Sequence, residues 1–177
     1  MAVLVEAISV IIRVTAIHQK YPGGWEAFKR IIPNQTMCAD DELIRLGFMT
    51  PDAVKAFVSS LQKSGLEFLK DGKAIDVAVA DQMRGLTSKC HWAEFGRINL
   101  GGKQNQKVGA CLLVDSQLIQ VVMPPDWKFE GSQSQTFAFV PTEHAQNGMQ
   151  FLHHENGLDV YLNPITGKEM YVGRTGE

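Results

Sequence analysis

Apolar positions in the first fifty residues follow two different periodicities. Residues 3–14 are almost continuously apolar and rich in β-branched side chains, which predicts a single central strand covered on both faces. Two short helices are predicted next, at residues 15–21 and 25–32. In the second, apolar side chains recur on one helical stripe, and Pro33 ends it.

Two hairpins are predicted by turn residues that stand between apolar runs. The first spans residues 36–49, with its turn at Asp40-Asp41. The second joins residues 66–70 to residues 73–81 through Asp71-Gly72, a pair typical of a type I′ turn. The two hairpins frame the segment with the clearest helical signal.

That helical segment begins at Thr50-Pro51. A threonine hydroxyl can cap free backbone amides, and proline fits the first helical turn because it needs no hydrogen bond there. Gly65 supplies a residue suited to the left-handed conformation that ends many helices. Apolar residues recur between these points at helical spacing, namely Val54, Phe57, Val58 and Leu61.

The order of elements through residue 82 is therefore strand, helix, strand, strand, helix, strand, strand. This order predicts an α+β fold with a split βαβ, ferredoxin-like layer and one extra strand. We expect residues 1–82 to form this half of the molecule.

Residues 83–177 are expected to form a mostly antiparallel β half. Eleven of the sixteen glycines lie there, and no segment shows sustained helical periodicity. The last part, residues 149–172, predicts a three-stranded meander with turns at Asn156-Gly157 and 164–167. Without a long linker, the two halves are expected to share one core. The other strands predicted in this half cover residues 92–100, 108–114, 118–123 and 137–140.

Composition and charge limit the cellular compartment and the classes of partner that we expect for this chain. The 177 residues include 17 basic and 19 acidic side chains, for a net charge of -2. Without a basic stripe, nucleic-acid binding is not expected. The first residues lack the basic start of a secretory signal, and no apolar run is long enough to span a membrane. Three cysteines without disulfide or metal spacing predict reduced thiols in the cytoplasm. The sequence leaves the oligomeric state open.

The reactive residue types do not form a known catalytic or metal motif. Cys90 and His91 are adjacent, and adjacent side chains of an extended segment point to opposite faces, so structural roles are favoured for both. No phosphate or dinucleotide loop occurs, and no cofactor is expected. No metal site is expected either, because the HExxH pattern is absent from the densest cluster of possible ligands, His144, His153, His154 and Glu155.

Three carboxylates, Glu6, Asp76 and Asp81, fall in or beside predicted strands. A carboxylate taken out of water needs a partner, and such positions are also where catalytic groups occur. Salt bridges are the favoured interpretation. The candidate partners are Arg13, Arg45 and Arg84.

These patterns favour a non-catalytic, cytoplasmic protein-binding domain, and in particular an immunity-type inhibitor that neutralises a toxin or enzyme by direct contact. Aromatic side chains are enriched at such interfaces, and an acidic surface can steer a basic partner. The expected partner-binding residues are Trp25, Asp40, Asp41 and Glu42. Trp92 and Trp127 are either exposed tips of the same surface or core residues, with core packing favoured.

The alternative is a small enzyme or ligand-binding domain with a pocket between the two halves. Whether the chain is an enzyme stays open, with no catalytic function the favoured answer. The enzyme alternative requires that several reactive side chains converge in one concave site. The candidates are Glu6, Asp76, Asp81, Cys90 and His91.

Overall fold

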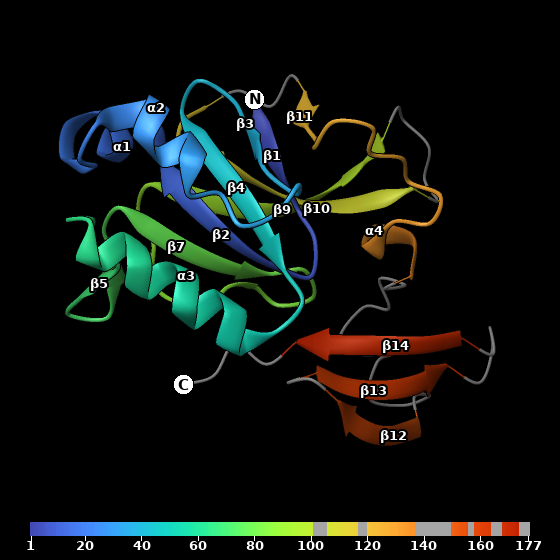
Figure 1. Ribbon diagram of the computed structural model, residues 1–177. Coiled ribbons are helices and arrows are strands. Elements are labelled where there is room, and N and C mark those ends of the chain that lie inside the picture. The colour runs from blue at the N-terminus through green and yellow to red at the C-terminus, as the bar shows by residue number, and fades with distance from the viewer. Residues whose placement is uncertain (101–105, 117–119, 137–149, 156–157, 164–167, 174–177) are drawn as a thin grey trace.

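The computed structural model is a mixed α+β fold with several sheets and few helices (Figure 1). It describes residues 1–100, 106–116, 120–136, 150–155, 158–163 and 168–173. For residue 136 and the last three of these ranges, only the backbone is described. No helix in these ranges has the length and apolar character needed to cross a membrane.

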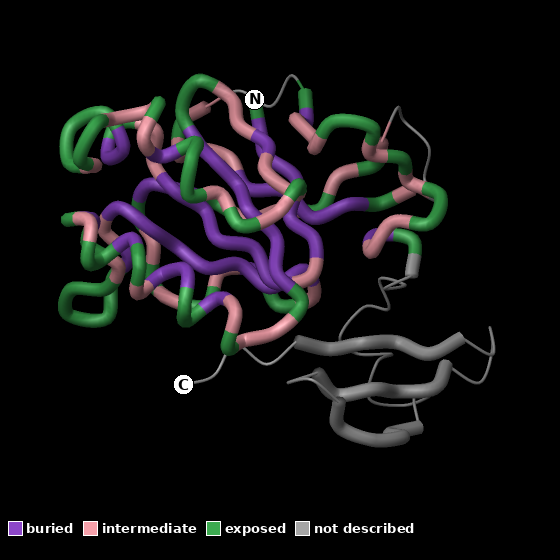
Figure 2. Tube along the Cα trace, viewed as in Figure 1, coloured by how far each residue is buried: buried purple, intermediate pink, exposed green. Residues whose placement is uncertain are grey.

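A five-stranded sheet forms the centre of the molecule, in the order β3-β4-β2-β7-β8 with antiparallel neighbours. Figure 2 shows that long buried stretches follow its three middle strands. Side chains alternate between its two faces, and both faces are covered. The strands are β2 (Ile8–Arg13), β3 (Cys38–Ala39), β4 (Leu43–Phe48), β7 (Val77–Asp81) and β8 (Gly85–Leu86).

Three helices cover one face of this sheet, namely α1 (Val14–Lys20), α2 (Gly24–Arg30) and α3 (Pro51–Lys63) (Figure 1). The predicted start of α3 is confirmed, since the Thr50 hydroxyl accepts a hydrogen bond from the Ala53 backbone N–H. The predicted apolar face of α3 is buried in the core with β2, β4 and β7. It comprises Val54, Phe57, Val58 and Leu61.

A four-stranded sheet covers the other face, in the order β11-β1-β10-β9. β1 pairs antiparallel with β10 and parallel with β11. A second apolar cluster joins β1 and β10 to the small and aliphatic side chains of the central sheet. The strands are β1 (Ala2–Val5), β9 (Ala93–Asn99), β10 (Lys107–Leu113) and β11 (Val121–Val122).

The single strand predicted for residues 3–14 is wrong, because the chain changes sheets at Glu6-Ala7. β1 belongs to the four-stranded sheet and β2 to the five-stranded sheet. Ala7 has a φ of 49°, a left-handed conformation that breaks the strand. Both strands are buried on both faces, so the apolar pattern runs through the break without a change.

The remaining elements are two small sheets and a short helix, α4 (Gln133–Thr136). Asp71 and Gly72 join β5 (Leu69–Lys70) to β6 (Lys73–Ala74), and their φ angles of 53° and 74° fit the predicted type I′ turn. The meander near the end is observed as β12 (Gln150–Glu155), β13 (Leu158–Asn163) and β14 (Lys168–Gly173). The strand predicted at residues 137–140 lies outside the described residues.

Leu61→Ala is expected to lower the free energy of unfolding by about 2 to 5 kcal/mol, because it leaves a cavity where a fully buried side chain joined α3 to the sheet. Chemical denaturation followed by circular dichroism measures this change. The matched control is Gln62→Ala on the exposed side of the same helix, expected to change stability by less than about 0.5 kcal/mol. Equal effects of the two substitutions would contradict the packing described for α3.

Candidate functional site

A pocket of about 520 Å³ lies beside the junction of β1 and β2. Its lining comes from both predicted halves of the chain. Glu6, Thr36, Arg45 and Met49 belong to the first half, and the loop 124–127 with Gln133 belongs to the second. This pocket is the candidate functional site.

Arg45 is a buried cation in the wall of this pocket. Only 3% of the residue is exposed, and its side chain leaves the middle of β4 on the face opposite the helices. The guanidinium donates hydrogen bonds of 3.0 Å to the Ser9 hydroxyl and to the backbone carbonyls of Thr36 and Glu6. All three acceptors are neutral. Burial lowers the pKa of Arg45, against the opposing influence of Cys38 and Glu6.

Gly47 leaves room for the Arg45 guanidinium. The two residues project on the same side of β4, and a Cβ atom added at Gly47 would lie 2.5 Å from an Nη atom of Arg45. The missing side chain therefore allows the charged group to lie flat across the strand beside the pocket.

Glu6 also lines the pocket, yet its carboxylate is not paired with Arg45. One carboxylate oxygen accepts a hydrogen bond from the indole N–H of Trp127. The other accepts one of 2.9 Å from the backbone N–H of Ser134. The salt bridge predicted between Glu6 and an arginine is absent from the ion pairs of the described side chains. Glu6 instead ties the loop 124–134 to the β1–β2 junction.

Gln82 holds the same junction from the other side. Its side-chain oxygen accepts a 2.8 Å hydrogen bond from the backbone N–H of Ala7, and its backbone N–H donates to the Ala7 carbonyl. The Gln82 amide nitrogen donates to the carbonyl of Gln133. A buried glutamine thus fixes both the strand break and the start of α4.

Asp76 forms a salt bridge, as predicted, but with Lys20 and not with an arginine. The distance between Lys20 Nζ and the carboxylate is 2.7 Å, and the same oxygen accepts a 2.8 Å hydrogen bond from the backbone N–H of Glu67. These contacts join the end of α1 to the segment that follows α3. They give Asp76 a structural role.

Asp81 lies at the end of β7 and is 2% exposed. One carboxylate oxygen accepts hydrogen bonds from the backbone N–H groups of Met83 and Arg84, at 2.8 and 3.1 Å. The other is buried without a hydrogen-bond partner among the described residues. Burial raises the pKa of Asp81, while these two N–H groups and the charge of Arg84 lower it by less.

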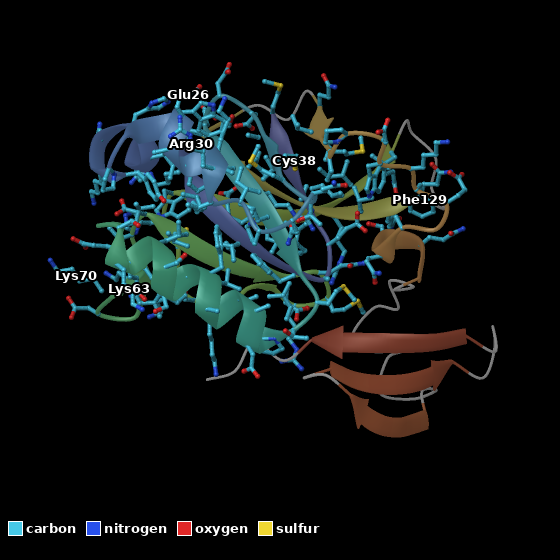
Figure 3. All side chains as sticks on the ribbon, in the orientation of Figure 1. Glu26, Arg30, Cys38, Lys63, Lys70 and Phe129 are labelled. Atoms are coloured by element: carbon cyan, nitrogen blue, oxygen red, sulfur yellow. The ribbon has the colours of Figure 1, made fainter. Side chains whose placement is uncertain are left out.

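The cysteines and His91 do not join this site. Cys38 is buried where β3 meets β4 (Figure 3), and burial raises the pKa of its thiol to about 11. Burial likewise raises the pKa of Cys111, on β10, to about 12. Cys90 packs half-buried against the core between the sheets, and His91 is exposed. Of the five candidates of the enzyme alternative, only Glu6 lines the pocket.

The residues predicted to bind a partner lie elsewhere. Asp40 orders its turn, since one carboxylate oxygen accepts hydrogen bonds of 2.7 Å from the backbone N–H groups of Glu42 and Leu43. Asp41 and Glu42 are exposed, and a Glu42 oxygen accepts a 3.3 Å hydrogen bond from Ser116. Trp25 is half-buried on α2 and packs against the helix-side core.

The other two tryptophans do not form exposed tips. Trp92 is 6% exposed, and its indole N–H donates a 3.0 Å hydrogen bond to the carbonyl of Ala74. Trp127 is half-buried against Glu6. Core packing, the favoured interpretation, is therefore correct for Trp92.

No set of three potential metal ligands is grouped together among the side chains that the structure describes. His144 of the predicted histidine cluster lies outside the described residues. For His153, His154 and Glu155 on β12, the backbone alone is described.

Sequence reasoning named Glu6 and Arg45 but missed the pocket that they share with Trp127. The sequence contains one signal for the site, because Arg45 stands among apolar residues in a predicted strand. A charged side chain in such a strand needs hydrogen-bond or ionic partners. The pairing with a loop more than 100 residues away has no signal in the sequence.

No protein-family model, curated protein or solved structure matches this chain. Its function is therefore inferred from the positions and contacts of its own residues.

The raised pKa of Asp81 predicts a specific pH dependence of stability. Between the ordinary pKa of 3.8 and the raised value, the folded state binds more protons than the unfolded chain. The contribution of the Asp81 carboxyl group to stability is therefore largest at low pH and is lost as the pH rises through its folded-state pKa. Asp81→Asn removes this titration. The unfolding free energy of the wild type, measured relative to the variant by denaturation from pH 4 upward, should fall as pH increases. Parallel curves would contradict the buried state of Asp81.

The thiols are expected to differ in reactivity in the folded protein. With a pKa of about 11, roughly one Cys38 side chain in a thousand is a thiolate at pH 8, and the fraction for Cys111 is smaller still. Iodoacetamide followed by peptide mass spectrometry should leave both unmodified in the native protein and should modify Cys90 first. In denaturant, all three should react. Rapid native labelling of Cys38 or Cys111 would contradict their burial.

Proposed function

We propose that this chain is a non-catalytic binding protein. The observation that carries the proposal is the separate engagement of its reactive side chains in the fold. Asp76 holds Lys20, Asp81 binds backbone amides, and Cys111 is a buried thiol. Catalysis requires a nucleophile or base within hydrogen-bond reach of a reacting group. Because these side chains already serve the fold at separate places, we favour a binding function over a catalytic one.

The proposed contact with a protein partner uses Trp25, Asp40, Asp41 and Glu42. A binding surface loses less entropy on association when its backbone is ordered beforehand. Asp40 orders the acidic turn, and the carbonyl of Glu42 accepts a hydrogen bond from Val14 at the start of α1. The exposed carboxylates of this turn would attract a basic partner.

The specific form of the proposal is an immunity-type inhibitor that acts in the cytoplasm and neutralises a toxin or enzyme by direct contact. A preordered acidic turn suits such a role, because a loop that is rigid before association pays a smaller ordering cost and binds more tightly.

A ferredoxin-like layer is the fold proposed for residues 1–82. It is supported by the strand order β3-β4-β2-β7 and by two crossovers, from β2 to β3 and from β4 to β7, that both contain helices. The division at residue 82 stays a prediction. One strand crosses this division, because β1 belongs to the first half and pairs with β10 of the second.

Ligand binding in the pocket is a second candidate function. It is favoured by one observation, the presence of a buried cation and a buried carboxylate in the same lining without a salt bridge between them. Convergent polar groups in an otherwise apolar pocket are typical of small-molecule sites.

The protein-contact proposal is tested by charge reversal at the acidic turn. The double substitution Asp41→Arg and Glu42→Arg should abolish recovery of the partner when tagged chain is purified from its native host and bound proteins are quantified by mass spectrometry. Glu67→Arg with Glu94→Arg is the matched control, because both positions are exposed and the change in charge is the same. The partner should bind the wild type and the control equally.

Two results would contradict this proposal. Retention of the partner by the acidic-turn variant would exclude this surface as the interface. An identified partner enzyme whose activity stays unchanged when equimolar purified chain is added would exclude the inhibitor function.

A further inference from the structure

We propose that the pocket beside the β1–β2 junction binds a small organic monocarboxylate, with the ligand carboxylate on Arg45 and an apolar body against the loop 124–127. This inference rests on the second candidate function, ligand binding in the pocket. It is independent of the acidic turn.

The first step of the argument is the hydrogen-bonding capacity of Arg45. A guanidinium carries five N–H bonds. Three are used within the described residues, one each to Ser9, Thr36 and Glu6. Two donors of a buried cation therefore remain for a ligand. The guanidinium lies against Gly47, and both residues line the pocket.

The second step is the charge of the missing partner. A buried cation is normally paired with an anion, because removal of an ion from water is costly. The acceptors around Arg45 are a hydroxyl and two carbonyls, and the carboxylate of Glu6 is occupied by Trp127 and Ser134. An anion that enters the pocket would supply the direct ion pair that Arg45 lacks among the described residues.

The third step distinguishes a carboxylate from a phosphate. The planar fork of arginine matches the two oxygens of a carboxylate as well as those of a phosphate. Glu6 lines the same pocket, however, and its negative charge repels a second anion more strongly when that anion carries two charges. A monoanion is therefore favoured.

The rest of the pocket determines the body of the ligand. Phe48, Met49, Pro124, Pro125 and Trp127 contribute apolar surface. The volume of about 520 Å³ falls in the range of small-molecule sites, which is about 300 to 1,000 Å³. An aliphatic or aromatic group attached to the carboxylate would fill this part.

The experiment compares each carboxylate with its uncharged amide on the wild-type chain. The probes are butyrate, benzoate and 3-phenylpropionate, their three amides, and inorganic phosphate, with calorimetry for affinity and the indole N–H resonances in NMR spectra for location. We expect at least one carboxylate to bind at least tenfold more tightly than its amide and than phosphate, and to shift the Trp127 resonance.

Met49 tests the role of charge without disturbing the hydrogen bonds of Arg45. Met49 is 42% exposed and lines the pocket, so a substitution there is compatible with the fold. Met49→Glu should weaken carboxylate binding at least fivefold, because it adds a negative charge at the pocket. The isosteric control Met49→Gln removes the same apolar surface without adding a charge, so Met49→Glu should bind the carboxylate at least fivefold more weakly than Met49→Gln does.

The possible failures are distinguishable. Equal binding of carboxylates and amides would overturn the carboxylate inference and leave a ligand-binding pocket. Tighter binding of phosphate would overturn the argument from Glu6. Failure of every probe to bind at millimolar concentration would overturn both this inference and the ligand-binding function, while the acidic-turn experiment would still decide the protein-contact proposal.

Discussion

Burial of the Arg45 guanidinium is the constraint around which this end of the fold is organised. The charge lies inside the protein, and its hydrogen bonds connect β4 to two other parts of the chain, the β1–β2 junction at Glu6 and Ser9 and the segment at Thr36. The carbonyl of Glu6 belongs to the strand break, so the cation helps to hold the point where the chain changes sheets. A buried charge kept in place by backbone carbonyls is costly to disturb, because loss of any acceptor leaves a donor unsatisfied.

The same constraint connects the fold to the pocket. Glu6 presents its carbonyl to Arg45 and its carboxylate to Trp127, so one residue joins the strand break to a distant loop. On β7 of the central sheet, the small residues Ala78 and Ala80 face the four-stranded sheet, while the larger Val77 and Val79 face the helices. This asymmetry lets the two sheets approach closely. The pocket lies at the margin of that contact, where polar groups replace apolar packing.

Local signals explain what the sequence could predict. The helix at Pro51–Lys63 and the turn at Asp71-Gly72 depend on neighbouring residues, and both were predicted with their causes. The break at Glu6-Ala7 was not, because apolar residues continue through two strands that are each covered on both faces. The pocket depends on contacts between residues separated by more than 100 positions. Periodicity carries no information about such contacts, so the residues were named without the site they form.

The position of β1 has a consequence for biosynthesis. This strand lies between β10 and β11, and about 100 residues separate it from the start of β10. At ribosomal rates of about 5 to 20 residues per second, β1 waits roughly 5 to 20 s for its first partner. During that time a fully apolar strand has both edges unpaired, a state prone to association with other nascent chains. β1 thus precedes by many residues both of the strands with which it pairs, and it is exposed to other chains until they have been made.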